Sequence, residues 1–139
     1  MSEEHNIEIV RRGYEAFLRG DVVALVSVMD ENVEWVTPGP PELPTAGRRR
    51  GHLGVIEFVK ALNALVELDR FEPKEFIARG DRVVVLGDNT SLVRSTGRIL
   101  DFEWAHAFTL RDGKVIAFHE YSDMVAIANE VRAANERRP

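Results

Sequence analysis

The chain has 139 residues, 45% of them hydrophobic and 29% charged, which is typical of one globular domain spanning residues 1–139. It contains no cysteine, and this excludes disulfides, thiolate nucleophiles and cysteine-ligated metals. A formal net charge of -5 disfavours nucleic acid and anionic membranes as partners, because both attract positive charge. The polar N-terminus and the lack of a long apolar stretch predict a cytoplasmic protein.

The first segments predict two helices and a strand. Apolar side chains recur at helical spacing over residues 4–19. Gly20 is a candidate helix end, and Asp21 is a candidate N-cap for a short second helix that reaches about Met29. Alternation from Val33 to Thr37 then predicts a strand.

Residues 38–50 contain four prolines and two glycines, which predicts a rigid loop without regular structure. Such a loop is either a rim or lid for a site or a plain surface connection, and the pattern does not choose between them. A third helix is predicted for residues 51–68.

The second half of the chain predicts an antiparallel sheet. Four strands are expected at residues 70–78, 82–95, 98–111 and 114–122, joined by short turns. Asp112-Gly113 is the strongest of the turn signals, because both central residues of a tight hairpin need positive φ. A final helix is predicted from Asp123, its candidate cap, to Arg137. Helices followed by antiparallel strands indicate an α+β fold.

The strand 98–111 carries five apolar side chains and one histidine, His106, on a single face. A lone histidine on such a face is most often a satisfied core residue. The neighbouring strand has two alternations, and each mixes apolar and polar residues. One inward set is Ile116, Phe118, Glu120 and Ser122, and the other is Val115, Ala117, His119 and Tyr121. The first set would join Glu120 to His106 as an acid–base pair or as a structural ion pair, and both interpretations stay open.

Two long segments resemble the nuclear transport factor 2-like superfamily. They are RRGYEAFLRGDVVALVSVMDENVEWVTPGP near the start and FEWAHAFTLRDGKVIAFHEYSDMVAI near the end. The resemblance covers about residues 4–130 and is nearest to the SnoaL-like polyketide cyclases and the ketosteroid isomerase-related proteins. It implies a cone-shaped roll, in which a curved, mostly antiparallel mixed sheet packs on three to four helices around a central apolar pocket.

The resemblance also implies roles for particular residues. Tyr14 and His106 match the two hydrogen-bond donors of ketosteroid isomerases, but Thr37 stands at the position of their base and cannot act as one. Glu120 and His106 match the acid–base carboxylate and histidine of the cyclases, with glutamate in place of aspartate. The side chains expected to bind substrate are Phe17, Trp35, Thr37, Phe58, Phe102, Trp104 and Phe118.

Two hypotheses follow. The first is a cofactor-free enzyme that cyclises or isomerises a small hydrophobic carbonyl compound through an enolate, with Glu120, His106 and Tyr14 as catalytic residues. The second is a non-catalytic ligand-binding or dimerisation module. No metal or cofactor site is expected, since the histidines lack ligand spacing. The resemblance implies a homodimer through the outer sheet face, and Val85, Val93 and Ile99 would suit such a sheet-on-sheet contact.

Overall fold

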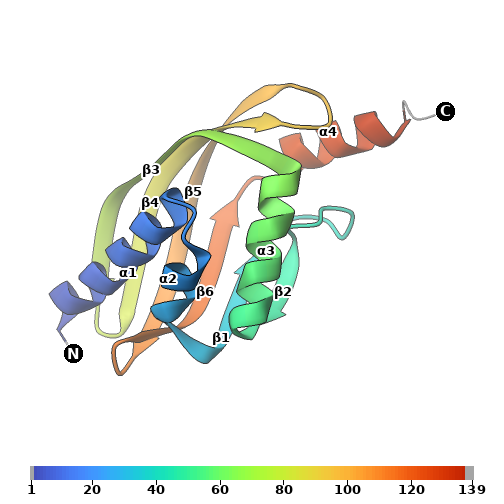
Figure 1. Ribbon diagram of the computed structural model, residues 1–139. Coiled ribbons are helices and arrows are strands. Elements are labelled where there is room, and N and C mark those ends of the chain that lie inside the picture. Colours follow the sequence, from blue (N-terminus) through green and yellow to red (C-terminus); the bar gives the residue numbers. More distant parts are fainter. Residues whose placement is uncertain (1, 137–139) are drawn as a thin grey trace.

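In the computed structural model, which describes residues 2–136, a six-stranded mixed sheet curves around three helices to form an α+β cone (Figure 1). The fold class predicted from the sequence is confirmed. The elements in chain order are α1 Glu3–Leu18, α2 Val22–Ser27, β1 Met29–Thr37, β2 Gly47–Arg50, α3 Gly51–Leu65, β3 Val66–Arg79, β4 Arg82–Val93, β5 Ile99–Arg111, β6 Lys114–Ser122 and α4 Val125–Glu136.

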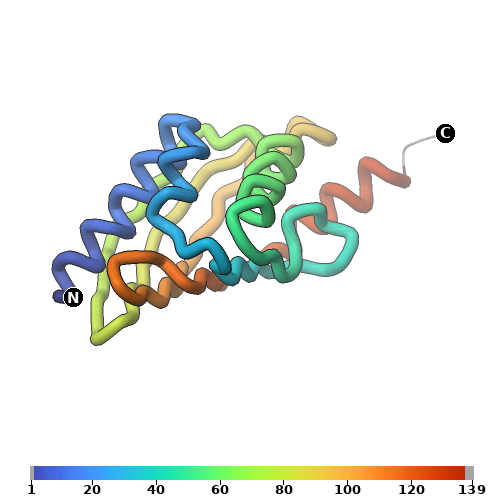
Figure 2. Tube along the Cα trace, turned by 60° about the horizontal axis from the view of Figure 1, so that its bottom comes forward, coloured from blue at the N-terminus to red at the C-terminus, as the bar shows by residue number. Residues whose placement is uncertain are grey.

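The strands lie in the order β2-β1-β6-β5-β4-β3. Only β1 and β6 are parallel, and every other pair is antiparallel. Helices α1, α2 and α3 cover the concave face of the sheet, whereas α4 extends beyond the end of β6 (Figures 1 and 2). Within residues 2–136, no helix covers the opposite face of the sheet.

Local signals in the sequence explain several boundaries. The Ser2 hydroxyl caps α1 by accepting from the His5 amide, and the Asp21 carboxylate caps α2 by accepting from the Ala24 amide. The turn between β5 and β6 has φ of 51° at Asp112 and 78° at Gly113, as the hairpin prediction requires. Each of these features depends only on neighbouring residues.

Other boundaries differ from the prediction. The segment 38–50 is not entirely loop, because residues 47–50 form β2 and pair with β1. Helix α3 ends at Leu65 rather than at residue 68, because residues 66–68 pair with β4. The second helix is also shorter than predicted, and β1 already begins at Met29. Arg137, the predicted end of the last helix, lies outside the described residues.

The register of the sheet settles which residues face inward. Val85 lies directly opposite His106 and is fully buried, as is Val93, so the prediction that both valines belong to the outer face is wrong. Ile99 is 64% exposed. The pairing of β5 with β6 is irregular between Thr109 and Leu110. Because of this irregularity, Val115 rather than Ile116 is the buried residue at the start of β6.

Two hydrophobic clusters hold the cone together. The larger joins α1, α2 and α3 to the concave face, and the smaller, around Leu43, Val66, Val93 and Ile127, joins the proline-rich loop and α4 to the sheet. No helix within residues 2–136 is long and apolar enough to cross a membrane.

Candidate functional site

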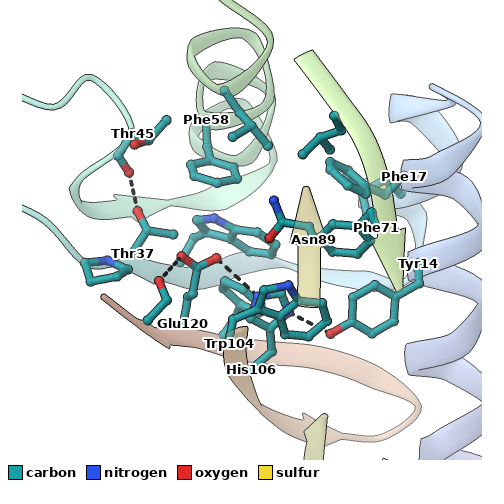
Figure 3. Close-up of a pocket in the computed structure, with 18 of the residues that line it drawn as sticks. Tyr14, Phe17, Thr37, Thr45, Phe58, Phe71, Asn89, Trp104, His106 and Glu120 are labelled. Atoms are coloured by element: carbon teal, nitrogen blue, oxygen red, sulfur yellow. Dashed lines mark hydrogen bonds and ion pairs between the residues drawn. The ribbon is translucent and has the colours of Figure 1, made fainter. Parts of the chain in front are cut away.

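A cavity of about 120 Å³ lies between the helices and the concave face of the sheet (Figure 3). Its wall is almost wholly apolar, and Glu120 is the only Asp, Glu, Lys or Arg among the described residues that line it. All the side chains that the sequence proposed for a site meet here, namely Tyr14, Phe17, Trp35, Thr37, Phe58, Phe102, Trp104, His106, Phe118 and Glu120.

A chain of hydrogen bonds crosses the floor of the cavity. The Tyr14 hydroxyl lies 2.7 Å from His106 Nδ1, and His106 Nε2 lies 3.1 Å from Glu120 Oε1. The Ser122 hydroxyl donates to the second carboxylate oxygen, Oε2, over 3.0 Å. Glu120 and His106 lie directly opposite each other on β6 and β5. Of the two alternations considered for β6, the chain therefore adopts the one in which Glu120 faces inward beside His106.

The protonation states follow from burial. Burial lowers the pKa of His106 below its usual 6.5, and Glu120 opposes this shift only in part. Burial also raises the pKa of Tyr14 far above its usual range, and the charge of Glu120 adds to that effect. At neutral pH the Tyr14 hydroxyl therefore donates to Nδ1 of a neutral imidazole, and its Nε2–H donates to Glu120.

Aromatic rings hold this hydrogen-bonded chain in place. The Trp104 ring stacks on His106 with ring centroids 3.9 Å apart, and the Phe71 ring stacks on Trp104 with centroids 5.0 Å apart. The indole can lie flat because Gly87, its partner on β4, has no side chain. On the other wall, Trp35 stacks on Phe118 with centroids 3.8 Å apart. That contact follows from the parallel pairing of β1 and β6.

The sequence reasoning did not assign a site role to several polar residues of the cavity. Asn89 and Ser91 line it from β4 and are joined by a 2.7 Å hydrogen bond, and Ser122 lines it from β6. Their signal was available, since each alternates with outward residues on a strand that also carries inward apolar groups. Thr45 also lines the cavity, but it comes from the loop and had no periodic signal.

The proline-rich loop forms part of the cavity wall rather than a detached connection. The Thr37 hydroxyl donates to the Thr45 carbonyl, and Leu43 is 2% exposed within the cluster that includes α4. Glu42 forms an ion pair with Arg132 of α4. Asp123 accepts from the Val125 amide at 2.9 Å and thereby caps α4, as the sequence predicted.

Comparisons with known proteins agree with this fold. The model of the SnoaL-like domain family matches residues 10–118. The chain belongs to the SnoaL-like family. A structure of an NTF2-like protein from Burkholderia xenovorans LB400 is 39% identical, with 94% of this chain and 98% of that chain covered and a TM-score of 0.85. The structure of TerC co-crystallised with polyporic acid is 32% identical, with 92% and 98% covered and a TM-score of 0.82.

Proteins with lower sequence identity to this chain also share its fold. A putative SnoaL-like polyketide cyclase from Jannaschia sp. CCS1 is 22% identical, with 99% of this chain and 95% of that chain covered and a TM-score of 0.78. No protein among those with curated descriptions matches significantly. Within the described part of this SnoaL-like domain, no three His, Asp or Glu side chains gather as metal ligands would.

Proposed function

We propose that this SnoaL-like domain binds a small hydrophobic carbonyl compound in its cavity and transfers a proton at the carbon next to the carbonyl group. Glu120 is the base in this proposal, and no cofactor takes part. The observation that carries the proposal is a single carboxylate, held by two hydrogen-bond donors, in an otherwise uncharged and largely apolar cavity.

The surroundings of Glu120 suit a base. Its side chain lines the cavity and is 20% exposed, while His106 and Ser122 each donate to one carboxylate oxygen and so fix its direction. The wall of the cavity is largely apolar, and a proton transfer in such a site proceeds with little rearrangement of solvent.

The proposed reaction begins with the transfer of one proton from the substrate to Glu120. A carboxylate oxygen of Glu120 takes a proton from the carbon, the electrons of the C–H bond form a C=C bond, and the carbonyl becomes an enolate. Isomerisation follows if Glu120 returns the proton to a different carbon. Cyclisation follows if the enolate carbon attacks a second carbonyl carbon of the same molecule, whose C=O π electrons move to its oxygen while that oxygen takes the proton from Glu120 and becomes a hydroxyl group.

His106 and Tyr14 serve as positioning residues in this scheme. Their hydrogen bonds are directed to each other and to Glu120, and so neither has a further proton to offer to a ligand when His106 is neutral. Phe17, Phe58, Phe102 and Phe118 provide the apolar contacts for the substrate, together with Trp35, Trp104 and the methyl group of Thr37.

Deuterium exchange into 2-indanone tests the proposal, because this compact ketone has acidic C–H groups beside its carbonyl. We expect the wild-type protein in D₂O to accelerate the exchange over buffer, as followed by NMR. Glu120→Gln should reduce the protein-dependent rate by about 10²–10⁴-fold, the range for loss of a general base. Its dissociation constant for 2-indanone should change little, since the amide has the same shape.

Glu103→Gln is a matched control, because Glu103 is exposed and its strand position faces away from the cavity. This variant should keep the wild-type exchange rate. Wild-type exchange in Glu120→Gln would show that Glu120 is not the base. Tight binding of 2-indanone with no exchange by the wild-type protein would instead favour the non-catalytic binding module.

Polyporic acid is a second ligand to test, because TerC was co-crystallised with it and is 32% identical to this chain. We expect polyporic acid to compete with 2-indanone for the cavity. If 2-indanone stays bound in the presence of saturating polyporic acid, the two compounds do not share a site.

We also propose that two copies pair through the outer face of the sheet. This face exposes Ile77 on β3, Leu86 on β4 and Tyr121 on β6. Acidic residues lie on β5, at Asp101 and Glu103, and Arg48 and Arg50 lie on β2. A second copy therefore offers both an apolar surface and opposite charges. Sedimentation should give a dimer that Tyr121→Lys converts to a monomer, and a monomeric wild-type protein would refute this pairing.

A further inference from the structure

Several residues that line the cavity carry a buried polar atom without a partner. Among the described residues, four buried side-chain polar atoms have no hydrogen-bond partner, namely Asn6 Oδ1, Trp35 Nε1, Thr45 Oγ1 and Trp104 Nε1. Three of these four belong to residues that line the cavity together with Glu120. Folded proteins leave few buried polar groups unpaired, so a group of them around one cavity calls for an explanation.

The two indole groups are the most specific part of this set. Trp35 is 7% exposed and Trp104 is 6% exposed, and an indole N–H is a donor only. Each ring is fixed by stacking, Trp35 on Phe118 and Trp104 on His106, and neither can turn outward to reach water without breaking its stack. Both tryptophans line the cavity, so an acceptor atom of a ligand bound there would supply the missing partner.

An enolate needs such donors. The negative charge that forms on the ligand oxygen has to be stabilised by hydrogen bonds, yet Tyr14 and His106 direct theirs to each other and to Glu120. Glu120 itself can only accept a proton or a hydrogen bond while it is ionised. The donor role is therefore left open by the residues that the family resemblance assigned to it.

We propose that the indole N–H groups of Trp35 and Trp104 bind the oxygen atoms of the ligand, so that the cavity selects apolar ring compounds carrying at least one carbonyl oxygen. This inference rests on the proposed function, in which Glu120 acts on the carbon beside that carbonyl group. The Thr45 hydroxyl is a third group available to ligand oxygens at the loop side of the cavity. Hydrocarbons of the same shape lack the acceptor and bind more weakly.

The chain contains only two tryptophans, which makes the inference directly measurable. An ¹⁵N-labelled sample should show two indole N–H signals in the NMR spectrum. Trp35→Phe removes one signal and Trp104→Phe removes the other, so the two variants assign both signals. The probes are 2-indanone and indane, which share a ring frame and differ in the carbonyl oxygen. We expect 2-indanone to move at least one indole proton downfield well beyond the shift caused by indane.

Affinity provides the second readout. The Trp→Phe substitution at the hydrogen-bonding indole should weaken 2-indanone by about 3- to 10-fold, as expected for one net hydrogen bond, and leave indane nearly unchanged. Phe58→Leu is the matched control, because Phe58 lines the same cavity without a polar atom. It should weaken both ligands by similar factors.

Three results would overturn the inference. They are equal indole shifts with both ligands, equal losses of affinity for both ligands in the Trp→Phe variants, and failure of 2-indanone to bind at all. The wild-type spectrum alone decides the first, so the test survives a variant that does not fold. Binding with the predicted indole shift but without deuterium exchange would refute the proposed catalysis and leave the donor assignment intact.

Discussion

Gly87→Ala adds a single methyl group at the most crowded point of the sheet. A Cβ atom at Gly87 would lie 2.4 Å from Trp104 Cη2, 2.5 Å from Trp104 Cζ2 and 2.5 Å from the backbone oxygen of Glu72. Each of these distances is about 1 Å shorter than an ordinary van der Waals contact between such atoms. The new methyl group therefore collides with a rigid indole ring on one strand and with the backbone of another.

The expected cost follows from this collision. The φ angle of Gly87 is not positive, so alanine fits the backbone conformation and the penalty is steric alone. Overpacking of this kind costs about 1–3 kcal/mol, and we expect the upper half of that range because neither neighbour is flexible. A loss of about 2–3 kcal/mol lowers the Tm by roughly 7–10 °C in a chain of this length.

Gly13→Ala is the matched control, since it adds the same atoms in helix α1. Its Cβ would lie 3.6 Å from Val28 Cγ2, which is an ordinary contact, and its φ is not positive either. Alanine has the higher helix propensity, so we expect stability to rise by about 0.5–1 kcal/mol. Urea unfolding followed by circular dichroism measures both variants. Equal stability of Gly87→Ala and wild type would refute the packing of Trp104 over Gly87.

Tyr14→Phe leaves His106 Nδ1 buried without its hydrogen-bond donor. Urea unfolding should therefore show a free energy of unfolding lower by about 1–3 kcal/mol, and a decrease under about 0.5 kcal/mol would contradict the hydrogen bond. The lowered pKa of His106 makes stability depend on pH, because below pH 6.5 the unfolded chain binds a proton that the folded chain does not. The contribution of His106 is therefore complete above pH 6.5. As the pH falls from 6.5 through the lower pKa of the folded state, stability should decrease by up to about 1.4 kcal/mol per pH unit, and His106→Asn should remove this component from the stability–pH curve. Leu43→Ala should cost about 2–4 kcal/mol, because the side chain is 2% exposed, whereas a change near zero would mean that the proline-rich loop is a plain surface connection.

Some parts of the site could be predicted from single strands. Strict alternation along residues 98–111 places His106 among apolar side chains whatever its neighbours do, and the Asp112-Gly113 turn requires the next strand to return antiparallel. The helix caps at Ser2 and Asp21 likewise depend on neighbouring residues only. The assignment of an α+β fold needed no more than these local patterns.

Other parts required contacts between distant segments. Both alternations of residues 114–122 mix apolar and polar side chains, so only pairing with β5 and the irregularity at Ile116 select Glu120 as the inward residue. The parallel pairing of β1 with β6 stacks Trp35 on Phe118, and no local pattern encodes that register. The same limit explains the wrong placement of Val85 and Val93 on the outer face.

The sequence by itself determined which residue types could form a site, namely aromatic rings with one histidine and one glutamate on adjacent strands. The tertiary structure decided how their hydrogen bonds are used. Tyr14, 92 positions away from His106 along the chain, satisfies its Nδ1, and the two indole N–H groups are left unpaired beside the cavity. The reason is physical: side-chain alternation is a property of one strand, whereas hydrogen-bond satisfaction depends on every element that packs against it.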